Sequence, residues 1–500
     1  MKKTNKMVRI AILAALGWSL GGCSTMGPDR DPPRMPVAER YAATTSSEQL
    51  PEADGVRQQL DVGARPVPPW WKAYGSEELD GLVDEGLANS PSLAAAQNAL
   101  KSAHEALRSQ IGADLMPKVD LGLGAARVRA PLPPNFPQET FLENFYVGGV
   151  QASYSFNFFG AQLLGVRAQE RRYQEQAFHF ESIRRALATN IVLATINAAS
   201  LQDQLAATQR LVDLGEERAR QMNERYELGS ASRADMLATE EEAANLASSL
   251  PPLRAQLLAV RHAQAILLGR TPDKAPQPMA LEALHLPEHV PLALSTDLLH
   301  QRPDILAAEA GVRASAEAAG AAAASLYPSL TLTAAYGRGG FDWSTFTSPA
   351  GALWGLAAMI TQPLFHGGEL IARKHQYEAA HEAAVAQYKQ TVLSAFANVA
   401  DTLVSLEEDA NALAQAERAQ RAAQALHEDI GGRYELGSAP LSASLTVDEQ
   451  WQTANVQLTR ARALRLADTA NLFQAMGNPP VGPDEKFPDT VQMLMRSANE

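Results

Sequence analysis

The 500-residue chain contains a single cysteine, Cys23. One thiol excludes a disulfide within the chain and a zinc site built from several thiolates. Aromatic residues make up only 6% of the chain and charged residues 20%, while alanine is abundant. This composition favours long, closely packed helices over a conventional compact enzyme.

Basic charge is also scarce, because 43 basic residues face 56 acidic ones and the formal net charge is −13. An acidic surface repels nucleic acid, so we expect no nucleic-acid partner. The sequence has no zinc-protease His-Glu-x-x-His, no Gly-x-Ser-x-Gly and no phosphate-binding loop. We therefore expect neither an enzymatic activity nor a cofactor.

The N-terminus predicts a targeting signal. Four basic residues within the first nine precede the apolar stretch "IAILAALGWSLGG", which is too short to span a membrane. It ends at Leu20-Gly21-Gly22-Cys23, which resembles a bacterial lipobox and implies cleavage before Cys23 and lipidation of its thiol. The alternative is an ordinary signal peptide with a chance cysteine. Ser24, where an Asp would favour retention in the inner membrane, favours the outer membrane by resemblance to lipoprotein sorting.

Two long stretches lack proline, between Pro137 and Pro251 and between Pro363 and Pro440. Within the first, apolar residues recur at helical spacings of three and four: Ile183, Leu187, Ile191, Ala194, Ala198, Leu201 and Leu205. We predict long helices over 161–228 and 368–436, the first roughly 100 Å long. Return helices are expected over 232–268 and 441–476.

The heptapeptide "RYELGSA" occurs twice, at 225–231 and at 433–439. The same offset of 208 residues aligns Gly229 with Gly437 and Gly269 with Gly477 without a gap. This indicates an internal duplication, in which each copy of the heptapeptide ends a long helix and forms its turn.

Alternating residues predict two hairpins, 118–158 and 329–364, whose strands of about ten residues have the length of a tilted membrane strand. In "VQASYSFNF", for example, Val150, Tyr154 and Phe158 face one way and Gln151 and Ser153 the other. The alternative is a half-buried soluble hairpin. Four strands cannot close a barrel and an open edge cannot face lipid, so three copies would have to form a barrel of about 12 strands.

The chain resembles the outer membrane efflux protein family, the TolC/OprM-like outer membrane factors, and within it the lipoprotein (NodT-like) subgroup that serves RND pumps. The resemblance spans about residues 65–478. The motifs that carry it are "PPWWKAYGSEELDGLVDEGLANSPSLAAA", "QRPDILAAEAGVRAS", "YPSLTLTAAYG", "TQPLFHGGEL" and both "YELGSA" turns.

This resemblance implies a mixed α and β membrane protein: a homotrimer with a 12-stranded transmembrane β-barrel, continued by a long periplasmic α-helical barrel. It implies a Gram-negative outer membrane protein, lipid-anchored at Cys23 and spanning the membrane. Its expected function is that of a passive duct exporting drugs or other small toxic compounds, with a periplasmic adaptor protein and an inner-membrane RND transporter as partners. The alternatives are a duct for secretion driven by an ABC transporter and, in a different class, an envelope spacer.

The expected domains follow from the resemblance and the repeat. They are a signal peptide (1–22), a lipidated linker (23–68), a first repeat (69–270), an equatorial linker (271–300), a second repeat (301–478) and a C-terminal tail (479–500).

The resemblance also implies two sets of site residues. The turn residues Gly229, Ser230, Ala231, Gly437, Ser438 and Ala439 are expected to dock the adaptor, although each glycine also serves as a helix cap. Asp235 and Tyr434 match the pair whose hydrogen bond keeps the family's periplasmic gate shut, the alternative being that Tyr434 only packs at its helix end.

The sequence departs from the family pattern at three places. Ala443 and Thr446 replace the acidic residues of the aperture, and Ala439 replaces the arginine of a second gate link. Pro251-Pro252 should break the first return helix, because an interior proline costs about 3 kcal/mol or more.

Three further patterns each have two interpretations. His366 and His375 are interpreted as solvated surface residues rather than metal ligands, and "TEEEAA" (239–244) as a solvated helix face rather than a cation site. "GRGG" (337–340) is predicted to be an extracellular turn rather than a phosphate loop.

Overall fold

The computed structural model describes residues 27–35, 50–52, 55–64, 69–131, 140–292 and 301–477. The chain divides into two compact units. Unit 1 contains Met1–Arg34, Ala99–Gln176 and Ala307–Lys389, and unit 2 contains Met35–Asn98, Ala177–Leu306 and Gln390–Glu500. The predicted lipidation residue Cys23 and the predicted tail lie outside the described residues.

Two long helices have the same length. Helices α4 (Ala161–Glu227) and α10 (Glu369–Glu435) each contain 67 residues and are offset by 208 positions at both ends. The sequence predicted helices over 161–228 and 368–436. The next glycines, Gly229 and Gly437, adopt φ values of 70° and 73°, which residues other than glycine rarely adopt.

Each glycine sits in the same capping arrangement. At the first turn the amide of Ser230 donates to the carbonyl of Arg225 at 2.7 Å, and that of Gly229 to the carbonyl of Tyr226 at 2.9 Å. The second turn repeats both bonds 208 positions later. Carbonyls left over at the helix end are thereby satisfied, and the chain reverses direction.

The return segments differ, and the break expected at the prolines is confirmed. The first return consists of α5 (Arg233–Ser248) and α6 (Leu250–Leu267), whereas the second is the single helix α11 (Leu441–Met476). Pro251 and Pro252 lie in the first turn of α6, where a missing amide hydrogen costs no helix bond. Thr459 and Arg460 occupy the corresponding positions of α11 and keep it continuous.

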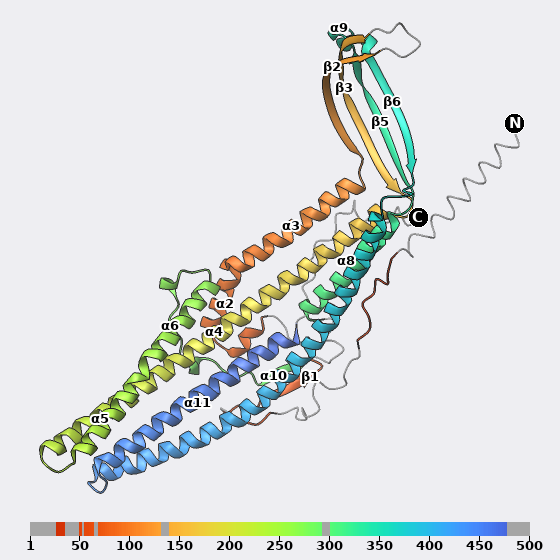
Figure 1. Ribbon diagram of the computed structural model, residues 1–500. Coiled ribbons are helices and arrows are strands. Elements are labelled where there is room, and N and C mark those ends of the chain that lie inside the picture. The colour runs from red at the N-terminus through yellow and green to blue at the C-terminus, as the bar shows by residue number, and fades with distance from the viewer. Residues whose placement is uncertain are drawn as a thin grey trace. The chain divides into compact units, whose positions relative to one another are not determined.

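Unit 1 contains an antiparallel sheet of four strands in the order β2-β3-β5-β6 (Figure 1). The strands are β2 (Lys118–Pro131), β3 (Thr140–Asn157), β5 (Ser329–Gly340) and β6 (Ala352–Thr361). They contain 14, 18, 12 and 10 residues, so the first hairpin is longer than the ten residues per strand that the sequence predicted.

Two local predictions for this sheet were wrong. Gly337–Gly340 is not a turn but the end of β5, and the connection is made by α9 (Trp343–Thr347) and η4 (Pro349–Gly351). The glycines serve strand pairing instead, since a Cβ on Gly337 would lie 2.3 Å from the carbonyl oxygen of Gly148. Phe158 lies beyond β3, because the Asn157 side chain accepts from the Phe159 amide at 2.8 Å and turns the chain.

Helices precede both hairpins. Helices α2 (Glu77–Asn89) and α3 (Pro91–Asp114) come before β2, and α8 (Pro303–Ala324) comes before β5. Among the described residues, no helix is both long enough and apolar enough to cross a membrane.

In unit 2, part of the linker predicted over 23–68 belongs to a small sheet. Its strand β1 (Gln59–Val62) pairs in parallel with β4 (His289–Leu292), within the predicted equatorial linker. The same linker contains the short helices η2 (Pro272–Lys274) and η3 (Leu281–Ala283).

The tryptophan motif of the sequence forms part of the core of unit 2. In η1 (Trp70–Tyr74), the ring of Trp70 stacks on Phe473 at 5.1 Å between centroids. The Tyr74 hydroxyl donates to the carbonyl of Leu466 at 2.9 Å. Helix η1 is thereby fastened to the C-terminal part of α11.

Candidate functional site

One face of the four-stranded sheet is apolar along most of the strands, up to the row that contains Arg338 of β5. Residues paired directly across antiparallel strands share a face, and one such row runs through Leu121, Val150, Tyr336 and Trp354. With the neighbouring rows, this apolar face comprises Val119, Leu121 and Leu123 of β2, Val150, Ala152, Tyr154 and Phe156 of β3, Leu330, Leu332, Ala334 and Tyr336 of β5, and Trp354, Leu356, Ala358 and Ile360 of β6.

This face is open. Leu121 is 71% exposed, Trp354 73% and Leu356 77%. In a soluble protein, such residues would be buried in the core. Many exposed apolar side chains on one side of a sheet mark a surface that contacts lipid or another protein. The half-buried soluble alternative therefore does not fit the sheet.

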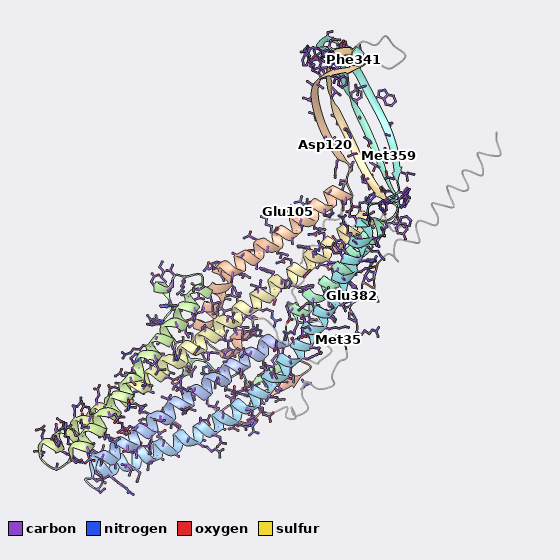
Figure 2. The ribbon with its side chains drawn as sticks, in the orientation of Figure 1. Met35, Glu105, Asp120, Phe341, Met359 and Glu382 are labelled. Atoms are coloured by element: carbon purple, nitrogen blue, oxygen red, sulfur yellow. The ribbon has the colours of Figure 1, made fainter. Side chains whose placement is uncertain are left out.

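The opposite face carries small and polar side chains. It includes Asp120, Gln151, Ser153, Ser155, Thr331 and Thr333. The hydroxyls of Ser155 and Thr331 lie 3.2 Å apart across two strands, within hydrogen-bonding distance. An apolar face and a polar face on one twisted sheet suit a wall between lipid and water. Figure 2 shows Asp120 of the polar face on β2.

Aromatic rings gather at the end of the sheet where α9 lies. The Tyr146 ring lies 5.6 Å from that of Trp343 and 6.3 Å from that of Phe346. The ring of Phe341, seen at this end in Figure 2, lies 5.6 Å from that of Phe145. Tyrosine and tryptophan at a strand end are typical of the rim of a membrane-spanning sheet.

In the part of the chain that the structure describes, both outer strands of the sheet lack a partner strand on one side. There, strand β2 pairs only with β3 and strand β6 only with β5. Their outer amides and carbonyls need partners wherever water is absent, so the described sheet is incomplete as a membrane wall.

The helical turns form the second candidate site, in unit 2. Figure 1 shows the α4–α5 and α10–α11 turns at the same end of that unit. Leu228 is 83% exposed and Leu436 85%, and a Cβ built on Gly229 or Gly437 would meet no atom within 4 Å. The turns thus present bare backbone flanked by an exposed leucine.

The turn serines have a role that the sequence did not reveal. The Ser230 hydroxyl donates to the carbonyl of Arg225 at 2.9 Å, and the Ser438 hydroxyl to that of Arg433 at 3.0 Å. Both hydroxyls therefore support the helix caps, so a substitution at either serine changes the cap as well as the surface.

The structure does not join the predicted gate pair. Asp235 forms a capping box with Ser232 at the start of α5: the Asp235 amide donates to Ser232 Oγ at 3.1 Å and the Ser232 amide donates to Asp235 Oδ2 at 3.3 Å. The Ser232 hydroxyl also donates to Asp235 Oδ2, at 2.7 Å. Tyr434 is 40% exposed. Among the described residues, no hydrogen bond links Tyr434 to Asp235, and the gate remains a prediction.

Sequence reasoning missed an ion-pair cluster that joins the two helical hairpins within unit 2. Arg218 of α4 lies 3.2 Å from Glu449 of α11 and 3.6 Å from Glu242 of α5. No periodicity marks these residues, because the pairing depends on how the hairpins pack. Burial raises the pKa of the Glu449 carboxyl while Arg218 lowers it, and the net direction is upward.

The described residues hold few other candidates for a metal-binding site. Glu240, Glu241 and Glu242 lie on α5, His366 precedes α10 and His375 lies on it. Within the described ranges, no group of three or more His, Cys, Asp or Glu side chains is arranged to hold a metal ion.

A sheet with one lipid-like and one water-like face, joined in sequence to two very long helical hairpins, defines a channel-forming subunit. Residues 82–270 and 294–478 match the model of the family described as outer membrane efflux protein. The chain belongs to this family, and it is a protein of the Gram-negative outer membrane.

Individual relatives are similar over nearly the whole chain. The pyoverdine export outer membrane protein OpmQ of Pseudomonas aeruginosa is 27% identical over 467 residues, covering 92% of this chain and 94% of OpmQ. The toluene efflux pump outer membrane protein TtgC of Pseudomonas putida is 28% identical, covering 93% and 94%. The solved structure of the outer-membrane channel OprN shares the fold, with a TM-score of 0.79 at 23% identity, covering 91% of this chain and 99% of OprN.

Proposed function

We propose that this protein is the trimeric exit duct of a tripartite RND efflux system, which passes small toxic compounds from a periplasmic adaptor and an inner-membrane pump to the exterior. The observation that carries the proposal is the incomplete sheet: an apolar face for lipid, a polar face for water and two unpaired edges.

The number of copies follows from the sheet. Strand β2 of one copy can pair with β6 of the next, and closure by symmetry removes every open edge. Three copies of four strands give a barrel of about 12 strands, which is within the range of known membrane barrels.

The helices support an internal repeat below that barrel. Besides the equal lengths of α4 and α10, Gly269 and Gly477 make matching close approaches 208 positions apart. A Cβ on Gly269 would lie 2.4 Å from the carbonyl oxygen of Asn89, and one on Gly477 would lie 2.8 Å from that of Gln301. Two similar hairpins per chain, in three copies, would build an α-helical barrel.

The cargo is proposed to be small molecules. The named relatives are described by pyoverdine export and toluene efflux, both of which are small compounds. A duct for ABC-driven protein secretion is the alternative. Complementation separates them: the gene should restore drug resistance to a strain lacking its own channel only when an adaptor and RND pump are present, and restored secretion of a protein through an ABC system instead would overturn the RND assignment.

Three finer features belong to the same proposal. Cys23 carries the lipid anchor, the turns around Gly229 and Gly437 dock the adaptor, and Asp235 with Tyr434 forms the periplasmic gate. The exposed turn leucines supply the docking test, because their side chains take no part in the hydrogen bonds of the helix caps. Leu228→Glu and Leu436→Glu should lower adaptor cross-linking at an unchanged trimer level. Unaltered cross-linking would contradict docking at the turns.

The trimer itself is tested by disulfide cross-linking. Cys23 is the only native cysteine. Each variant therefore carries one new cysteine on β2, starting at Asp120, and a second on β6, starting at Met359 (both labelled in Figure 2). We expect a ladder ending at three chains for at least one pair. The matched control is Gln151→Cys with Ala335→Cys, which are partners within one chain and should give no ladder. Monomers throughout would refute the trimer.

A further inference from the structure

Helices α10 and α11 enclose a charged cluster that neither the channel nor its docking sites require. It consists of Asp409 on α10 and of Arg465 and Asp468 on α11. Arg465 is only 1% exposed, and its Nη1 donates to the carbonyl of Leu406. The Asp409 and Asp468 carboxyls are within hydrogen-bonding reach of one another, with Arg465 close to both.

The equivalent place in the first helical hairpin is apolar. The residues 208 positions earlier are Leu201, Leu257 and Val260. They belong to one hydrophobic contact between α4 and α6, together with Ala198, Leu205 and Leu253. Helix packing at this level is therefore satisfied by hydrocarbon alone. Burying a charged group there costs free energy unless it is fully compensated, so the second hairpin bears a cost that the first avoids.

When both carboxyl groups are ionised, the pair lacks one hydrogen-bond donor. Two carboxylates can only accept hydrogen bonds, and Oδ2 of Asp409 is buried without a donor. Asp468 receives one bond, from the side-chain Nδ2 of Asn471 at 3.0 Å. A single proton held between the two carboxyls supplies the missing donor and leaves one negative charge beside Arg465.

Other charges near the pair are few in the described structure. Asp468 borders a cavity of about 380 Å³ that is also lined by Arg302 and Asp401. Arg302 is already bound to Asp304, with 2.6 Å between nitrogen and oxygen. Burial, then the neighbouring Asp468, raise the pKa of Asp409 to about 7.

We propose that Asp409, Arg465 and Asp468 form a proton-dependent clasp between α10 and α11, closed when the carboxyl pair holds one proton and loosened when that proton is lost. The clasp is independent of what the channel carries. Since the pKa of Asp409 lies above its ordinary value of 3.8, the clasp contributes fully to stability below that value and loses its contribution as the pH rises through about 7.

The test is amide hydrogen exchange of the purified full-length protein at pH 5.5 and 8.5, corrected for intrinsic exchange rates. Peptides around Asp409 and Asp468 report the clasp, and peptides around Leu201 and Val260 in the same molecule are the internal control. The protection of the clasp peptides relative to the control should fall about 10- to 30-fold over this range. The lower value allows for screening, because Asp409 is only half-buried.

Two variants separate the clasp from a general effect of pH. Asp409→Asn keeps the shape of the protonated acid and should abolish the pH-dependent loss of protection. The swap Asp409→Leu, Arg465→Leu, Asp468→Val installs the residues of the first hairpin and should do the same. The proposal is overturned if the wild type shows no relative change, or if Asp409→Asn shows the same change as the wild type.

Discussion

Replacing Leu121 by arginine tests the assignment of the apolar face to lipid. Leu121 lies in the row that also contains Val150, Tyr336 and Trp354, and its side chain is 71% exposed in the single chain. If the face contacts lipid, Leu121→Arg places a charge in hydrocarbon. An arginine near the bilayer midplane costs about 2–4 kcal/mol, falling to about 0–1 kcal/mol near the interface.

The neighbouring strand position supplies the control. Asp120 precedes Leu121 on β2 and therefore points to the opposite face. Asp120→Arg introduces the same side chain on the polar face and should cost well under 1 kcal/mol. With three copies in a barrel, the difference between the variants would be roughly 6–12 kcal/mol per trimer, if the contributions add.

The assay is folding of the protein into lipid vesicles, followed by the band shift between unfolded chain and assembled trimer in a urea titration. Leu121→Arg should lower the midpoint strongly, while Asp120→Arg should leave it close to that of the wild type. Equal midpoints for the two variants would refute the lipid face, and the reverse order would show that the polar face is the one in contact with lipid.

Three further outcomes are expected. Thr459→Pro should destabilise α11 by about 3 kcal/mol or more, whereas Pro251→Thr in the first turn of α6 should change unfolding by less than 1 kcal/mol; equal effects in denaturant titrations would contradict the helix-start position of Pro251. Tyr434→Phe should raise the resting conductance of purified trimers in planar bilayers, as should Asp235→Asn; unchanged conductance in both would dismiss the gate. Cys23→Ala should leave the protein unlipidated, and mass spectrometry of the mature wild-type N-terminus would refute the anchor by finding a free thiol.

Much of the architecture could be predicted because it depends on local rules. The spacing of apolar residues, the long absence of proline and the turn glycines locate α4 and α10 to within a residue or so of their ends. The strands followed from side-chain alternation, and Pro251-Pro252 located the break between α5 and α6.

What could not be predicted depends on contacts between distant segments. The Arg218–Glu449 link joins residues 231 positions apart and leaves no trace in either local pattern. The "GRGG" segment looked like a turn, because glycines that permit a turn also permit close pairing of strands, as between Gly337 and Gly149. Asp235 is a different case: its contacts with Ser232, three residues away, are local, but the family resemblance suggested only a gate at this position.

The equal lengths of α4 and α10 restrict how such a protein can change length. Adding one residue to α4 alone would push its turn out by about 1.5 Å and rotate it by about 100° relative to the turn of α10. If the turns dock the adaptor as proposed, they would then no longer meet it in one plane or with the same side facing it. A longer or shorter version of this protein therefore needs matched insertions in both helices. Insertions of about 18 residues, which complete five turns, would preserve the direction in which each turn faces.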